Sequence, residues 1–322
     1  MTRRTVLQTL LASGALLRVA SPRSRGPRIG VTDWNLDKTG KIPAVALAAK
    51  LGFDGVQVSL GRTPDADKLP MGDASLQARY LAAAKEYGIG LAGTCLDILH
   101  VDHLKDNKRA QKWVADSIPI TANLKADVVL LPFFGKASLM NHAEMDYVGD
   151  VLKEIAPAAE KAGVSLGLED TISAEDNVRI MERSGSSAVK VYYDVGNSTG
   201  GGFDVVKEIR WLGADRICQM HLKDNPHYLG EGRIDFPAVM KAIQDIGFQK
   251  FAVLETDCPS KSVENDMARN LKYVRGLLAR PAGLPLRALN YEQIARIGII
   301  ACDRFVVLHR EPRRLPGFFP GR

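Results

Sequence analysis

The chain has 322 residues, of which 46% are hydrophobic and 25% are charged, and its formal net charge is +6. This composition excludes an intrinsically disordered chain and is sufficient to bury the core of one large α/β domain or of two smaller ones. The basic residues are spread along the sequence and concentrate only at its two ends, so the charge does not favour binding to nucleic acid.

Residues 1–24 have the features of a bacterial export signal. Arg3 and Arg4 precede an apolar stretch from Val6 to Leu17, which is too short to span a membrane. The order of residues around the arginine pair resembles a twin-arginine signal, although an ordinary basic leader is the alternative. We therefore predict a twin-arginine-type signal peptide, a periplasmic location and no stable membrane anchor.

From residue 28 onward, short β-branched runs alternate with longer amphipathic segments, several of which end in glycine, as helices commonly do. The predicted strands are 28–34, 55–60, 89–96, 127–133, 164–169, 189–194, 216–222 and 251–256. Eight strands, each followed by a helix, predict an α/β fold, a (β/α)8 TIM barrel over residues 25–280. A doubly wound open sheet is the alternative, but no G-x-G-x-x-G follows the first strand.

The strand and helix pattern stops near residue 280. The segment 281–322 is rich in proline and arginine and has no place in the barrel repeat. We predict an irregular C-terminal tail there and assign it no role.

Four consecutive predicted strands end in a side chain that can bind a metal: Glu169, Asp194, His221 and Glu255. In a barrel, the C-terminal ends of successive strands surround the axis, so inward-pointing residues there converge. Three carboxylates and one imidazole suit a divalent cation such as Mn2+, Mg2+, Co2+ or Zn2+, which would also offset the repulsion between the carboxylates. Each residue alone would fit a helix N-cap or a rim salt bridge, and for Asp194 alone we prefer that interpretation. For all four together, a metal site is favoured.

Six short motifs occur in an order and spacing that resemble one family: FDGVQV (53–58), LED (168–170), DVGN (194–197), HLKD (221–224), GEGRIDF (230–236) and VLE (253–255). With them, residues 28 to 280 resemble the sugar phosphate isomerase/epimerase family of the xylose isomerase-like TIM-barrel superfamily. The resemblance implies one divalent metal ion held by Glu169, Asp194, His221 and Glu255. Many relatives carry a second histidine where this chain has Asn197, which leaves the substrate contact at that position open.

The activity implied is that of a divalent-metal-dependent isomerase or epimerase acting on a keto sugar or related polyol. The carbon next to a carbonyl loses a proton to give a metal-bound enediolate, and the glutamates Glu169 and Glu255 take and return that proton. Six residues are predicted to contact the substrate: Asn197, Lys223, Gln57, Asp97, His100 and Trp34. For Gln57 and Asp97 this prediction rests on the resemblance. Lys223 could instead pair with Asp224, His100 could be an ordinary loop histidine, and core packing explains Trp34 nearly as well.

Three other functions remain open. A lyase or dehydratase acting on a keto sugar or 3-keto-glycoside would use the same proton abstraction, followed by expulsion of a substituent. A metallohydrolase similar to endonuclease IV would need more histidines at strand ends than this sequence has. A non-catalytic sugar-binding barrel would not need two glutamates. The expected partner is a small carbohydrate, and relatives commonly form homodimers.

Overall fold

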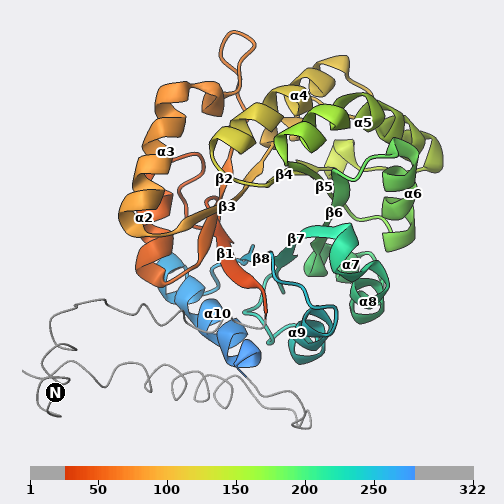
Figure 1. Ribbon diagram of the computed structural model, residues 1–322. Coiled ribbons are helices and arrows are strands. Elements are labelled where there is room, and N and C mark those ends of the chain that lie inside the picture. Colours follow the sequence, from red (N-terminus) through yellow and green to blue (C-terminus); the bar gives the residue numbers. More distant parts are fainter. Residues whose placement is uncertain (1–25, 280–322) are drawn as a thin grey trace, which may run out of the picture.

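A closed barrel of eight parallel strands forms the centre of the molecule (Figure 1), which confirms the predicted fold. The computed structural model describes residues 26–279. The strands are β1 (Arg28–Thr32), β2 (Gly55–Ser59), β3 (Gly90–Cys95), β4 (Val128–Pro132), β5 (Ser165–Glu169), β6 (Val189–Asp194), β7 (Ile217–Leu222) and β8 (Phe251–Leu254). Each strand pairs with its successor, and β8 pairs with β1 to close the barrel.

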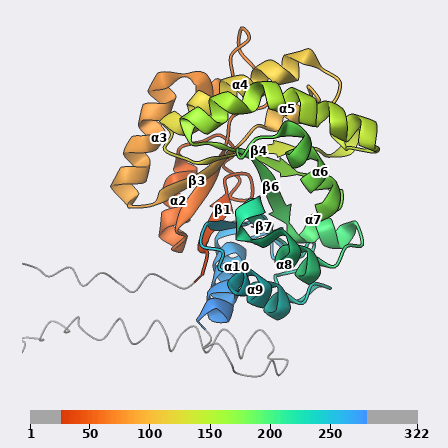
Figure 2. The same cartoon turned by 45° about the vertical axis from the view of Figure 1, so that its right-hand side comes forward.

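Helices surround the barrel, and α10 lies between α9 and α2 where the ring closes (Figure 2). They are α2 (Pro43–Leu51), α3 (Ala74–Tyr87), α4 (Lys108–Asn123), α5 (His142–Ala162), α6 (Ala174–Ser184), α7 (Val195–Gly200), α8 (Val205–Arg216), α9 (Phe236–Asp245) and α10 (Val263–Leu278). Short 3-10 turns are η1 (Pro70–Gly72), η2 (Asp97–His100) and η3 (Gly135–Ala137). As predicted, α2, α3 and α5 end at glycines in the left-handed conformation, Gly52, Gly88 and Gly163.

Two differences from the predicted elements lie beside the strand ends that matter for function. Glu255 lies one residue beyond β8, but its backbone N–H still donates to the carbonyl of Leu222 at 3.1 Å. The hydrogen bond therefore keeps Glu255 at the barrel mouth. The short helix α7 was not predicted; it begins directly after β6 because Oδ1 of Asp194 accepts a hydrogen bond from the backbone N–H of Asn197 at 2.8 Å.

Alternate residues of each strand face either the helices or the barrel interior. Outward residues such as Ile29, Val31 and Val58 join the main hydrophobic core beneath the helices. Inside the barrel, Phe251 packs with Ala92 and Val253 near the strand starts. A second interior cluster is formed by Cys95, Val128, Leu130, Tyr192 and Cys218.

The ring of Phe251 fills space that glycine leaves free in the barrel interior. A Cβ atom on Gly55 would lie 2.6 Å from two ring carbons of Phe251. We expect Gly55→Ala to lower the free energy of unfolding by about 1–3 kcal/mol, because an overpacked core must shift. Urea unfolding followed by circular dichroism measures this, with Gly72→Ala as the control, since its nearest neighbour would be 3.8 Å away. Equal stability of the two variants would contradict this packing.

The predicted signal peptide (1–24) and C-terminal tail (281–322) lie outside the described residues, so both stay predictions. Within residues 26–279, none of the helices combines the length and the apolar character that crossing a membrane requires.

Candidate metal centre

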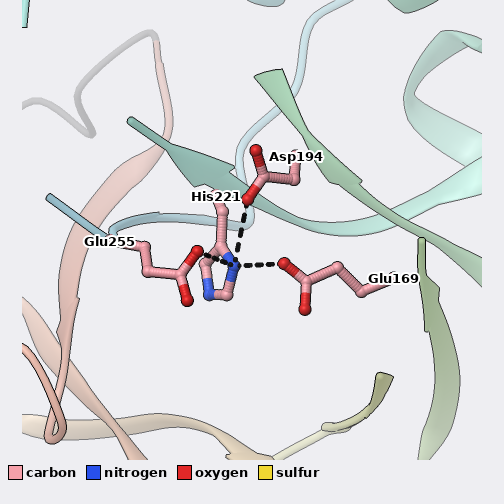
Figure 3. A group of neighbouring side chains, drawn as sticks. All are labelled: Glu169, Asp194, His221 and Glu255. Atoms are coloured by element: carbon pink, nitrogen blue, oxygen red, sulfur yellow. Dashed lines mark hydrogen bonds and ion pairs between the residues drawn. The ribbon is translucent and has the colours of Figure 1, made fainter. Parts of the chain in front are cut away.

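The four predicted ligands converge at the barrel mouth. One ligand atom from each of Glu169, Asp194, His221 and Glu255 lies within 4.8 Å of the other three. Nδ1 of His221 is at the centre of this group, 2.7 Å from Oε1 of Glu169, 3.4 Å from Oε2 of Glu255 and 3.6 Å from Oδ2 of Asp194 (Figure 3). The side chains therefore come together as the strand order requires.

The imidazole of His221 is held in a fixed orientation by residues deeper in the barrel. Its Nε2 is 2.8 Å from Oε1 of Gln57, which also accepts a hydrogen bond from the hydroxyl of Tyr192 at 3.1 Å. The ring of Tyr192 packs edge-on against the imidazole, with 4.6 Å between ring centroids. Because the amide oxygen of Gln57 accepts from Nε2, Nδ1 is the ring nitrogen that faces the carboxylates, where it can hold either a proton or a metal ion.

The electrostatics of this cluster favour positive charge at its centre. Burial raises the pKa of Glu169 to about 7, although the nearby imidazole opposes the rise. Burial alone would lower the pKa of His221, but the charges of Glu255 and Glu169 raise it to about 10. The pKa of Asp194 is held well below its usual range, against the effect of burial, by Lys223 and His221. A divalent cation would take the place of the Nδ1 proton, so the oxygen and nitrogen donor set fits the metal implied by the sequence.

Lys223 is part of the cluster, and the predicted alternative of a pair with Asp224 is wrong. Its Nζ lies 2.8 Å from Oδ2 of Asp194 and 2.6 Å from Oε2 of Glu255. The carboxylate of Asp224 instead accepts a hydrogen bond from the backbone N–H of Gly232. The lysine stem lies across Gly196, where a Cβ atom would be 2.4 Å from Cγ of Lys223. The glycine of the DVGN motif therefore leaves room for this lysine.

A cavity of about 760 Å³ opens beside the cluster. Five of the predicted substrate contacts line it, namely Asn197, Lys223, Asp97, His100 and Trp34. The sixth, Gln57, is fully buried behind His221 and is not among the lining residues. A second cavity, of about 790 Å³, is lined by residues at the opposite end of the barrel, such as Arg28 and Gly90 at strand starts, and contains none of the predicted site residues.

Trp34 and Asn197 present donors at the cavity wall. Nε1 of Trp34 donates to Oε1 of Glu255 at 3.0 Å, and the indole packs edge-on against the ring of His221. Nδ2 of Asn197 is buried and has no hydrogen-bond acceptor among the described residues. This amide is therefore a donor free to meet an oxygen atom of a bound molecule.

Two buried carboxylates, Asp97 in the cavity wall and Asp33 behind it, bind the backbone of the neighbouring loops. Asp97 accepts hydrogen bonds from Oγ of Ser59 at 2.6 Å and from the backbone N–H of Gly61 at 3.1 Å. Oδ2 of Asp33 accepts from the backbone N–H groups of Gly40 and Ser59. These bonds fix the loops that follow β1 and β2, and hence the cavity wall.

Asp33 gives a pH-dependent prediction. Burial raises its pKa from 3.8 to about 7, so the folded protein retains a proton that the unfolded chain releases. Between these two values, stability should fall as pH rises, by about 1.4 kcal/mol per pH unit for this group. We expect Asp33→Asn to gain stability relative to wild type between pH 5 and pH 8. Urea unfolding with chelator at both pH values tests this, and a constant difference between the two proteins would contradict it.

Two residues of the site, Tyr192 and Arg62, were not predicted. Tyr192 precedes Asp194 by two positions on β6, so the alternation of a strand already placed both on the inner face. Arg62 lines the cavity from an irregular loop, and no sequence pattern marks such a position. Phe134, in the loop after β4, also lines the cavity and was likewise not predicted as a site residue.

Comparisons with known proteins agree with the barrel fold. The family model described as xylose isomerase-like TIM barrel matches residues 45–277. A curated 2-epi-5-epi-valiolone 7-phosphate 2-epimerase from an Actinoplanes species is 27% identical over 203 residues, which cover 62% of this chain and 73% of that protein.

Two solved structures share the fold at lower sequence identity. The apo form of 3-keto-D-glucoside 4-epimerase YcjR from E. coli superposes with a TM-score of 0.64 at 16% identity, covering 77% of this chain and 99% of that one. The structure of IolI with a bound zinc atom superposes with a TM-score of 0.62 at 17% identity, covering 80% and 100%.

Proposed function

Because the chain belongs to the xylose isomerase-like TIM barrel family, we propose that it is a divalent-metal-dependent isomerase or epimerase of a keto sugar or related polyol. The observation that carries the proposal is the convergence of two glutamates, one aspartate and one histidine on a single point beside a cavity. The epimerase names of a curated relative and of a solved structure support an enzyme of this class.

The chain's own residues suit the transfer of a proton next to a carbonyl group. A cation held by Glu169, Asp194, His221 and Glu255 would act as a Lewis acid toward substrate oxygens. Glu169 and Glu255 approach Nδ1 of His221 from opposite sides in Figure 3. One carboxylate can therefore take a proton from one side of the substrate and the other can return it.

The residues around the two glutamates hold the reacting groups in place. The carboxylate of Glu255 accepts hydrogen bonds from Trp34 at one oxygen and from Lys223 at the other, which fixes its plane. The ammonium of Lys223 and the amide of Asn197 line the same cavity and can donate to a substrate oxygen that gains negative charge. Most of the cluster is buried, which limits the access of water molecules to the reacting groups.

The test combines metal analysis with isotope exchange. We expect the purified protein to bind one equivalent of divalent metal, and to exchange solvent deuterium into one of a panel of ketoses and 3-keto-glycosides only when metal is present. Exchange that persists in chelator, or no exchange with any keto sugar, would contradict the proposal. Exchange accompanied by a released substituent would identify the lyase reaction instead.

The hydrolase alternative makes a different prediction. A three-metal centre needs more ligands than the group of four that residues 26–279 provide. Cleavage of abasic DNA together with three bound metals per chain would favour it over the isomerase.

We also propose that residues 1–24 direct export to the periplasm, which the order of Arg3, Arg4 and the following apolar stretch supports. Fusion of this segment to a folded reporter tests the proposal. We expect Arg3→Lys combined with Arg4→Lys to stop export, whereas unchanged export would indicate an ordinary leader.

A further inference from the structure

The metal-type ligands occupy one side of the barrel mouth, while the cavity extends to the other side. The ligands lie at the ends of β5, β6 and β7 and one residue after β8, and these four strands are neighbours in the closed barrel. The same cavity is also lined by Arg62, His100 and Phe134, from the loops that follow β2, β3 and β4. A molecule bound at the ligand cluster would therefore have further space beside it, above the opposite strands.

The size of the cavity exceeds what one sugar ring requires. If each of the roughly twelve non-hydrogen atoms of a hexose is given the ~30 Å³ that one water molecule occupies in the liquid, the whole sugar needs about 360 Å³. The cavity measures about 760 Å³. A single ring held at Glu169 and Glu255 would leave about half of this volume to water.

The far part of the cavity has an apolar face suited to a sugar ring. The rings of His100 and Phe134 stack with 6.2 Å between centroids and an angle of 26° between planes. Both side chains are only half-buried, and both line the cavity. The electron-rich face of an aromatic ring attracts the weakly positive C–H groups on one face of a pyranose. Pro70 and Pro132 add apolar lining, and Arg62 supplies donors for hydroxyl groups.

We propose that the substrate is a keto sugar joined to a second sugar residue, and that this second ring binds the distal subsite, defined as Arg62, His100 and Phe134. The inference rests on the proposed function, because the reacting ring is placed at the glutamates. A phosphate group fits the subsite less well. Among the described residues that line this end of the cavity, Arg62 is the only lysine or arginine, and its side chain is exposed to solvent. The carboxylate of Asp97 lines the same end of the cavity.

The first experiment compares kcat/KM for solvent deuterium exchange among a 3-keto-hexose, its methyl glycoside, a 3-keto-disaccharide and a keto sugar phosphate. We expect the disaccharide to exceed the monosaccharide by about tenfold or more. Phe134→Ala and His100→Ala should each lower the ratio of the disaccharide rate to the monosaccharide rate by most of that tenfold, whatever either variant does to the monosaccharide rate itself. Tyr87→Ala is the matched control, because Tyr87 is an exposed aromatic residue at the end of α3, outside the cavity lining.

The second experiment measures binding without turnover. Saturation-transfer NMR with an unreactive disaccharide should show contact to both rings, and Phe134→Ala should remove the contact to the second ring. Equal rates for monosaccharide and disaccharide, or a preference for the sugar phosphate, would overturn the distal subsite. If no keto sugar exchanges deuterium but binding of the second ring depends on Phe134, then the proposed reaction fails and the subsite stands. If no keto sugar exchanges deuterium and the second ring shows no contact that depends on Phe134, both the proposed reaction and the distal subsite are rejected.

Discussion

Replacing Glu255 with glutamine is expected to lower solvent deuterium exchange by about 10²–10⁴-fold, the usual contribution of a positioned general base. Glutamine has nearly the same shape and can still accept a hydrogen bond from Trp34 through its carbonyl oxygen. It cannot take a proton from carbon. Exchange measured by NMR at saturating metal, with isothermal titration of the metal, separates loss of the base from loss of the ligand. We expect Glu169→Gln to behave in the same way.

Asp194→Asn is the matched control for the glutamate variants. Asp194 is a predicted ligand like the two glutamates, but the proposed chemistry gives it no proton to transfer. Its Oδ1 accepts from the backbone N–H of Asn197, a bond that asparagine can keep. We expect weaker metal binding and recovery of most activity at high metal concentration. Recovery of Glu255→Gln to the same extent would show that Glu255 is a ligand only, and would remove the proton-transfer role from the proposal.

The barrel and the ligand cluster were predictable from sequence because both follow from short local patterns. Apolar runs ending in acidic or histidine residues identify inward positions at strand ends, and the closed order of strands brings consecutive ends together. Glu255 shows the limit of this precision. It lies one residue beyond β8, yet the continued hydrogen bond to Leu222 keeps it in the cluster.

The contacts that depend on long side chains and loops were not predictable in this way. Lys223 follows a ligand histidine closely and precedes Asp224, so its ammonium could reach either the ligand cluster or Asp224. It reaches the cluster, where Gly196 leaves room for its stem. The stack of His100 on Phe134 joins the loops after β3 and β4, whose backbone paths no periodic pattern determines. The fixed orientation of His221 depends on Gln57, 164 positions away in sequence.

Lys223→Met is expected to bind divalent metal more tightly and to turn over more slowly. The ammonium of Lys223 pairs with Oδ2 of Asp194 and Oε2 of Glu255, the same two oxygens that face Nδ1 of His221. A cation bound by those oxygens is repelled by the ammonium and competes with it. Removing the lysine should raise Mn2+ affinity by about tenfold or more, while the loss of a donor to the developing oxyanion lowers kcat by about 10²–10³-fold.

Isothermal titration with Mn2+ and exchange kinetics test the two opposite effects in the same variants. Gly196→Ala should shift both quantities in the same directions by a smaller amount, because the added Cβ displaces the lysine stem without removing its charge. Asp224→Asn should leave metal affinity within about twofold, since Asp224 contacts Gly232. Weaker metal binding in Lys223→Met would mean that the lysine holds the carboxylates in position for the cation. Its charge would then support metal binding, and the competition inferred from the shared oxygens would be wrong.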